Sequence, residues 1–261
     1  MRSISGVRRL SGFEESEPAE IFRTYRMSIL ACGTEMTYTK KEIEVLKAFG
    51  DYEGRRQEAE SGDGDKERFT MKERDIFRKI VEDCPVIAAV KDMEGLEKCL
   101  SSDIQAVFVL FGNICNIVDI VNRIKEAGRM AVVHIDLVAG LSSREISVDF
   151  IKENTRADGI ISTRQPLITR AKELGLLAVQ RFFVIDSMAL ESVLRHREYA
   201  ARPDFIEILP GTMPKIFRRV CAEIQTPVIA GGLISDKEDI MAALGAGACA
   251  ISTTNPQVWF M

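Results

Sequence analysis

Histidine and tryptophan are scarce in this chain of 261 residues. It contains two histidines, His134 and His196, and a single tryptophan. A structural zinc site needs about four histidine or cysteine ligands at close spacing, and the six cysteines are scattered without a CxxC pair. The sequence therefore predicts no metal site and no bound cofactor, and it predicts that the cysteines are buried free thiols of a reducing cytoplasm.

Long apolar runs and a strong net charge are also missing. No run approaches the roughly 18 apolar residues of a membrane helix, and the N-terminus has no apolar core of an export signal. The formal net charge is −4. An acidic balance disfavours a protein that coats nucleic acid, although it leaves room for a local basic face. We expect a cytoplasmic protein without membrane contact.

The first 70 residues differ from the rest in their content and spacing of apolar side chains. Residues 51–66 read DYEGRRQEAESGDGDK, which is highly charged and almost without apolar side chains. Such a segment cannot bury enough surface to order itself. Two short helices are plausible before it, at residues 19–30 and 40–49, but their apolar faces are weak. We therefore expect a poorly ordered, partly helical N-terminal extension over 1–70 and one folded domain over 71–261.

From Pro85 onward, short apolar runs alternate with amphipathic helical segments. Eight such runs occur, at residues 85–90, 106–111, 130–136, 159–163, 177–183, 204–209, 227–233 and 248–254. Near-continuous apolar strands joined by helices indicate a parallel sheet covered on both faces. Eight regular units predict an α/β fold in which the sheet closes into a compact (β/α)8 TIM-type barrel. The alternative is an open doubly wound sheet, which the absence of a GxGxxG turn disfavours.

In a barrel of this type, functional groups gather at the C-terminal ends of the strands, the mouth. Strand alternation places His134 and Asp136 inward, and it places Glu207 inward between two outward isoleucines. The sequence therefore predicts a polar mouth formed by Lys91, Asp136, Arg181 and Glu207. Each has a structural alternative: the charged groups neutralise one another, His134 is a hydrogen-bonded core residue, and Asp92 and Asp186 cap the helices that follow them.

Glycines and hydroxyls follow the last two strands. Gly231 and Gly232 end the seventh run, and Ser252 and Thr253 end the eighth. Without a Cβ, glycine lets backbone N–H groups approach an anion, and this is the recurring phosphate position of the fold. We predict a phosphate-binding site at these four residues. A tight turn with capping hydroxyls is the alternative reading.

Several segments together resemble a known family. GIIST at 159–163, QRFF at 180–183, IEILPG at 206–211 and AGGLIS at 230–235 are similar to the glycerol uptake operon antiterminator regulatory proteins, also called glycerol-3-phosphate responsive antiterminators. The resemblance covers residues 71–261, and residues 1–70 have no counterpart in it. It implies a regulator that binds glycerol-3-phosphate and then an mRNA leader, so that glycerol-utilisation genes are transcribed past a terminator. It implies no catalytic turnover.

An alternative function suits the same scaffold. A phosphotriose or phosphosugar isomerase or aldolase could use Lys91 as a Schiff-base amine, Asp136 as a base, Arg181 as a phosphate partner and Glu207 as an acid. The fold alone does not decide between the two, because this barrel serves many chemistries. A structural interaction module explains the charged mouth poorly. The sequence leaves open whether the protein forms a homodimer.

An RNA surface on an acidic protein has to be local. Between Arg164 and Arg219 the chain carries ten basic against six acidic residues, mostly on three consecutive helices. We predict a phosphate-tracking patch centred on Arg195, Arg197, Arg218 and Arg219. The alternative is an ordinary solvated helix face with cations near helix C-termini, where they suit the helix dipole.

Overall fold

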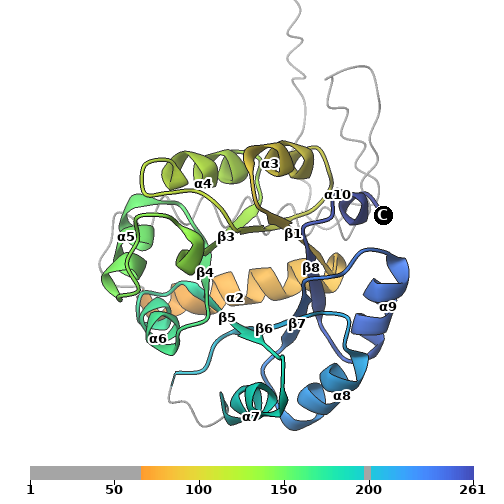
Figure 1. Ribbon diagram of the computed structural model, residues 1–261. Helices are drawn as coiled ribbons and strands as arrows, with labels where there is room; N and C mark the ends of the chain where they lie inside the picture. Colours follow the sequence, from red (N-terminus) through yellow and green to blue (C-terminus); the bar gives the residue numbers. More distant parts are fainter. Residues whose placement is uncertain (1–65, 197–200) are drawn as a thin grey trace, which may run out of the picture. The chain divides into compact units, whose positions relative to one another are not determined.

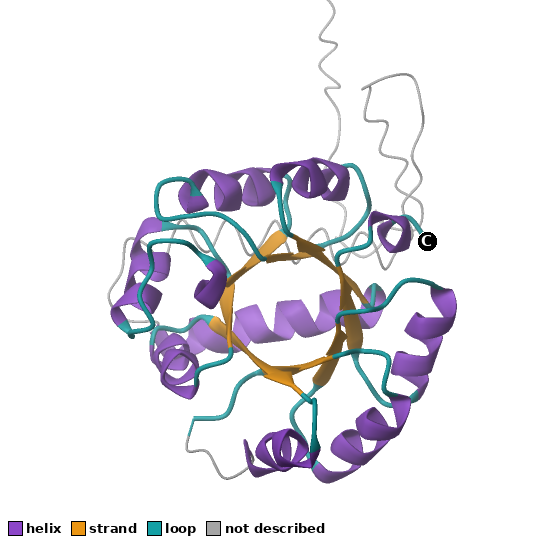
Figure 2. Ribbon diagram, viewed as in Figure 1, coloured by secondary structure: helices purple, strands orange, loops and turns teal. Residues whose placement is uncertain are grey.

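Eight parallel strands form a closed barrel in the computed structural model, which describes residues 66–196 and 201–261. Every strand pairs with its neighbour along the chain, and β1 pairs with β8 to close the ring (Figure 2). The predicted (β/α)8 barrel is confirmed. The strands are β1 Val86–Val90, β2 Ala106–Val109, β3 Met130–His134, β4 Gly159–Ser162, β5 Leu177–Phe183, β6 Phe205–Leu209, β7 Val228–Gly231 and β8 Ala250–Thr253.

Helices follow the strands and form the outer layer (Figure 1). Their apolar faces pack on the outward side chains of the strands, so that Val133 and Ile135, and likewise Ile206 and Ile208, lie in the core between barrel and helices. The helices are α2 Lys66–Asp83, α3 Met93–Leu100, α4 Ile117–Glu126, α5 Ile146–Asn154, α6 Gln165–Glu173, α7 Ser187–Arg195, α8 Pro214–Glu223, α9 Lys237–Gly245 and α10 Pro256–Trp259, with a 3-10 turn η1 at Ile135–Leu137.

Helix α2 precedes the first strand and covers the N-terminal end of the barrel, the base. In Figures 1 and 2 it crosses behind the ring of strands. Its Phe77 is fully buried, stacks on Phe108 with ring centroids 6.3 Å apart, and meets Phe205 edge-on at 4.9 Å. These rings come from α2, β2 and β6. The base is thus sealed by aromatic packing, a contribution that the sequence alone did not indicate.

The start of α2 corrects one expectation. Residues 66–70 were expected to be loosely ordered, yet they are helical and form the start of α2. They are helical because the chain continues without a break into the amphipathic segment that packs under the barrel. The rest of the predicted extension, including the helices expected at 19–30 and 40–49, lies outside the described residues.

The short connections follow the predicted chemistry. Asp92 and Asp186 cap α3 and α7, accepting hydrogen bonds from the backbone N–H groups of Gly95 and Ala189 at 2.7 and 2.8 Å. The cysteines of the described residues are free thiols, as expected. Among the described cysteines, the expected full burial holds for Cys99, whereas Cys84, Cys221 and Cys249 are half-buried. Cys115 is exposed because it lies in the loop between β2 and α4. In the described part of the chain, no helix is long and apolar enough to cross a membrane.

Candidate functional site

A polar layer lies inside the barrel, below its mouth. Arg181 of β5 and Glu207 of β6 are opposite each other in register, and Arg181 Nε donates a hydrogen bond to Glu207 Oε2 at 2.5 Å. The second carboxylate oxygen, Oε1, accepts from Ser252 Oγ of β8, also at 2.5 Å. Glu207 is completely buried and Arg181 is 6% exposed. The charge of the carboxylate is therefore matched inside the barrel, as a buried charge has to be.

Gly231 makes room for this network. A Cβ on Gly231 would lie 2.7 Å from Glu207 Oε1 and 2.9 Å from Ser252 Oγ, closer than side chains approach each other. Glycine is needed at the end of β7 because the Glu207 carboxylate and the Ser252 hydroxyl occupy the space that a side chain would fill. Among the four residues predicted to bind phosphate, Gly231 and Ser252 thus lie against the buried carboxylate.

His134 of β3 lies near the same layer. It is 3% exposed, and its Nδ1 has no hydrogen-bond partner among the described residues. Burial and, to a smaller extent, the positive charge of Arg181 lower the pKa of the imidazole to about 4, while Asp136 acts in the opposite direction. His134 is therefore a neutral ring at neutral pH. The alternative in which this histidine is a fully hydrogen-bonded core residue does not fit its unpaired Nδ1.

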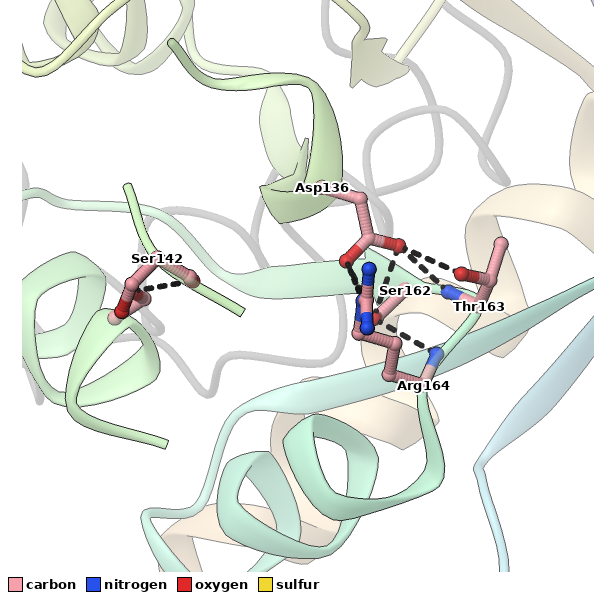
Figure 3. A network of polar contacts seen from close by, with 6 residues as sticks. Asp136, Ser142, Ser162, Thr163 and Arg164 are labelled. Atoms are coloured by element: carbon pink, nitrogen blue, oxygen red, sulfur yellow. Dashed lines mark hydrogen bonds and ion pairs between the residues drawn. The ribbon is translucent and has the colours of Figure 1, made fainter. Parts of the chain in front are cut away.

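Asp136 forms a second polar cluster at the mouth, shown in Figure 3. Its Oδ2 accepts hydrogen bonds from the backbone N–H of Thr163 at 2.8 Å and from the Thr163 hydroxyl at 3.1 Å. The Ser162 hydroxyl donates to the same carboxylate at 3.0 Å, and Arg164 Nε lies 3.7 Å from Oδ1. The carboxylate joins the end of β3 to the end of β4. Ser162 and Thr163 end the predicted run 159–163, and their hydrogen bonds to Asp136 become visible only in the structure.

The loop after β7 presents free backbone donors. Gly232 and Leu233 adopt positive φ angles of 73° and 59°. Outside the strand ladders of the described chain, neither N–H group donates a hydrogen bond, whereas the Gly232 carbonyl accepts from Gly211 N at 3.0 Å. Successive free N–H groups in such a loop favour an anion. This loop immediately follows Gly231, beside the Glu207 carboxylate.

The hydroxyls at the end of β8 are already engaged. Ser252 donates to Glu207, and Thr253 Oγ1 donates to the Ile234 carbonyl at 2.8 Å and accepts from Asn255 N at 3.1 Å. Thr253 therefore holds the β7–α9 loop against the start of α10. The structure brings Gly231, Gly232, Ser252 and Thr253 together, and it leaves backbone N–H groups, not these two hydroxyls, available as anion donors.

Lys91 stands apart from the other predicted mouth residues. It is exposed and lines a pocket of about 270 Å³ between the ends of β1 and β8. Asp92, Lys98, Thr254 and Trp259 also line this pocket. Lys98 is engaged with Glu94 at 2.7 Å. Lys91 thus places an accessible positive charge at the rim, on the β1–β8 side, rather than in the buried network of Arg181 and Glu207.

The basic residues predicted to contact RNA do not form one uniform patch. Arg195 and Arg218 are exposed on α7 and α8. Arg219 Nε donates to Glu223 at 3.1 Å and its Nη2 lies 3.9 Å from Glu191, so part of its charge is neutralised. Arg197 lies outside the described residues. Other cations of the same stretch point elsewhere, as Arg181 inside the barrel shows.

No group of histidine, cysteine or carboxylate side chains within residues 66–196 and 201–261 is arranged to hold a metal ion. One buried ion pair was missed by sequence analysis. Lys125 Nζ contacts both carboxylate oxygens of Asp158 at 2.9 Å, and Ala131 N donates to Asp158 Oδ2. This pair ties α4 to the starts of β3 and β4. It is structural, because it lies at the base, away from the mouth.

Comparisons with known proteins complete these observations. A model of the glycerol-3-phosphate responsive antiterminator family matches residues 86–259. An uncharacterized protein of Escherichia coli K12, YgcP, is 45% identical over 67% of this chain and 91% of its own length. The crystal structure of a glycerol uptake operon antiterminator regulatory protein from Listeria monocytogenes is 34% identical, covers 68% of this chain and 95% of that one, and has a TM-score of 0.65. The crystal structure of a glycerol uptake operon antiterminator-related protein from Thermotoga maritima is 33% identical, covers 67% of this chain and 98% of that one, and has a TM-score of 0.59.

Proposed function

The chain belongs to the glycerol-3-phosphate responsive antiterminator family, and from that premise we propose that it binds glycerol-3-phosphate at the mouth of its barrel and acts on an mRNA leader as a transcription antiterminator. One observation carries the ligand half of the proposal. The N–H groups of Gly232 and Leu233 lie directly beyond Gly231, where the Glu207 carboxylate and the Ser252 hydroxyl occupy the space that a Cβ would fill. Anion donors and hydroxyl acceptors thus lie within the reach of one small molecule.

Each part of glycerol-3-phosphate has a matching group at this site. The phosphate suits the N–H groups of the β7–α9 loop, and Lys91 and Arg181 supply positive charge around the mouth. Hydroxyls suit the carboxylates of Asp136 and Glu207, which accept hydrogen bonds strongly. The neutral His134 offers an unpaired ring nitrogen in the same interior.

A Schiff-base aldolase would need an activated amine, which the mouth lacks among the described residues. A Schiff-base lysine is activated by burial in an apolar pocket or by a neighbouring cation. Lys91 is exposed, and the buried Lys125 lies at the base in an ion pair with Asp158. The buried cation near the mouth is Arg181, which cannot form an imine and is paired with Glu207. The loops after most strands are short, which leaves little chain to close over a reacting substrate. These features favour a regulator over an enzyme.

Calorimetric titration tests the ligand site. Glycerol-3-phosphate is expected to bind, while glycerol and inorganic phosphate bind more weakly because each occupies one half of the site. Gly232→Val should abolish the heat of binding, since the positive φ is strained for valine and its Cβ would meet Leu209 at 3.1 Å. Gly245→Ala is the control, because a Cβ at Gly245 meets nothing within 4 Å. Normal affinity in folded Gly232→Val protein contradicts the proposed site.

The regulatory half requires its own measurement. Retention of a transcribed leader RNA on a filter should change when glycerol-3-phosphate is added, and no triose phosphate should be converted in the same solutions. Turnover that disappears in Lys91→Ala would instead establish the enzyme. The patch predicted at Arg195, Arg197, Arg218 and Arg219 is one candidate for the RNA surface.

A further inference from the structure

A second cluster of cations lies at the base of the barrel, far along the strands from the mouth. Arg74 and Arg78 lie one helical turn apart on α2, Lys172 lies in the last turn of α6, and Arg202 lies just before β6. Together they line a pocket of about 210 Å³, which we call the base pocket. Its remaining walls are Pro203, Asp204, Gln225, Thr226 and Pro227.

One carboxylate organises this pocket and neutralises only part of its charge. The Asp204 side chain is 3% exposed; it accepts from Lys172 Nζ at 2.5 Å and from Ala178 N at 3.0 Å, and Arg74 Nη1 lies 3.9 Å away. Four cations around one carboxylate leave a formal charge of about +3. The C-terminal end of α6 offsets a fraction of it through the helix dipole.

Two of the four cations are available to a ligand. Arg78 and Arg202 are exposed, and neither forms an ion pair with any residue of the described chain. Arg74 contributes an Nε that is buried and has no hydrogen-bond partner among the described residues. Two acids of the adjoining helices are engaged elsewhere, since Glu173 binds Arg170 at 2.9 Å and Glu223 binds Arg219. Asp75 of α2 lies 4.0 Å from Arg74 Nε and offsets part of the charge of that guanidinium. The donors of the base pocket are therefore in excess of its acceptors.

The lining of the base pocket indicates the class of ligand. It contains no aromatic ring and no apolar side chain larger than proline, so it has nothing with which to hold a base or a carbon skeleton. Its one recognisable chemistry is positive charge with guanidinium donors, which suits phosphate oxygens. Contacts of this kind to a phosphodiester backbone position a nucleic acid without reading its sequence.

We propose that the base pocket binds the phosphodiester backbone of RNA, through Arg78, Arg202 and Arg74. This inference rests on the proposed function, since it names the surface that the RNA contacts. It separates the two binding sites by the length of the barrel: the small phosphate ester enters at the mouth, and the polymer contacts the base. β5 and β6 connect the sites directly, because Ala178 and Asp204 lie at their base ends and Arg181 and Glu207 lie further along them.

The two candidate RNA surfaces offer a matched pair of variants in the full chain. Arg78→Glu/Arg202→Glu alters the base pocket, and Arg218→Glu/Arg219→Glu alters the α7–α8 patch by the same change in net charge. The probe is a fluorescein-labelled oligouridylate, titrated at several salt concentrations. The base variant should weaken binding and lower the slope of log K against log salt by about 1.4, since each single-strand phosphate contact contributes about 0.7. The α8 variant should bind as the wild type does.

Three controls make the result decisive. Melting curves check that the variants are folded, and Arg78→Gln/Arg202→Gln replaces the glutamates if repulsion from Asp204 unfolds the chain. Glycerol-3-phosphate titration of the same proteins reports the mouth separately, and unchanged ligand affinity with lost RNA binding supports the base pocket. Inorganic phosphate that binds the base pocket while the oligonucleotide does not would overturn the RNA assignment. So would loss of RNA binding in the α8 variant alone, or equal binding by all variants.

Discussion

The base of the barrel is closed by packing, whereas the mouth is organised by polar contacts. At the base, Phe77 of α2 fills the opening against Phe108 and Phe205. At the mouth, Arg181, Glu207 and Ser252 form a hydrogen-bonded layer below a loop with free N–H groups. Aromatic burial is non-directional and contributes mainly to stability. A buried ion pair contributes less net stability but fixes the positions of its groups, which is what a binding site needs.

This contrast implies that stability and binding can be changed separately. Changes at the base should lower the free energy of unfolding and leave ligand affinity intact in the folded fraction. Changes in the polar layer should alter both quantities, because the same atoms carry buried charge and face the ligand. The following experiments test that division, beginning with the largest effect.

Removal of the Glu207 carboxylate should have the largest effect. Glu207→Leu leaves Arg181 buried without a counter-charge, which costs about 3–5 kcal/mol of unfolding free energy. Ligand binding should be lost as well. The double variant Arg181→Met/Glu207→Leu removes both charges and should recover most of the stability but not the binding, as urea unfolding and calorimetry would show. A single variant as stable as the wild type would mean that the pair is solvated.

Phe77→Ala should affect stability alone. Removal of a fully buried ring costs about 3–5 kcal/mol, measured by urea unfolding. Under conditions where the variant is folded, its affinity for glycerol-3-phosphate should match that of the wild type. Phe260→Ala is the control, because this ring is 59% exposed and its loss should change stability by less than about 0.5 kcal/mol. Weakened ligand binding in Phe77→Ala would show that the base supports the mouth.

The two histidines report on the two regions through pH. His134 lies in the polar layer and His196 lies toward the base, where its Nε2 contacts Thr226 Oγ1 at 3.0 Å. Burial lowers the pKa of both rings, that of His134 to about 4. Between that value and 6.5 the unfolded chain binds more protons than the folded one. Stability is therefore full above pH 6.5 and falls as the pH drops toward 4, by on the order of 3 kcal/mol for His134.

The contribution of each ring can be separated by substitution. His134→Asn should flatten the rise of unfolding free energy between pH 4 and 6.5 more than His196→Asn does. In Arg181→Met, the His134 pKa measured by NMR should move up, because the nearby positive charge no longer opposes protonation. An unchanged His134 pKa in that variant would place Arg181 too far away to influence the ring.

Shortening the chain to begin at Met71 should have the smallest effect. The change removes residues 66–70 of α2 from the described chain and keeps Phe77, so the free energy of unfolding should change by less than about 1 kcal/mol. A chain that begins at Pro85 lacks α2 and should be strongly destabilised. A large loss from the Met71 start would show that residues before it stabilise the barrel.

The local pattern of the sequence was enough to predict the elements of the barrel and the side on which its residues lie. Alternation in FIEIL placed Glu207 inward and its isoleucine neighbours outward, because the side-chain period of a strand is a property of the backbone. The glycines after β7 likewise predicted a place for an anion, because only a residue without Cβ permits that approach. The helix cap at Asp92 was likewise predicted, because an aspartate before a helix accepts hydrogen bonds from its first N–H groups.

Which charges meet was decided only by closure of the barrel. Glu207 and Ser252 are 45 positions apart and touch because β6 and β8 flank β7, whose Gly231 leaves space for both side chains. Lys172 and Arg202 appeared in one basic stretch with Arg218, yet the fold gathers them with Arg74 and Arg78 at the opposite end from the mouth. Periodicity along a chain is local, whereas the partner of a charge depends on strand register, on helix placement and on what α2 covers, and these arise only from the packed whole.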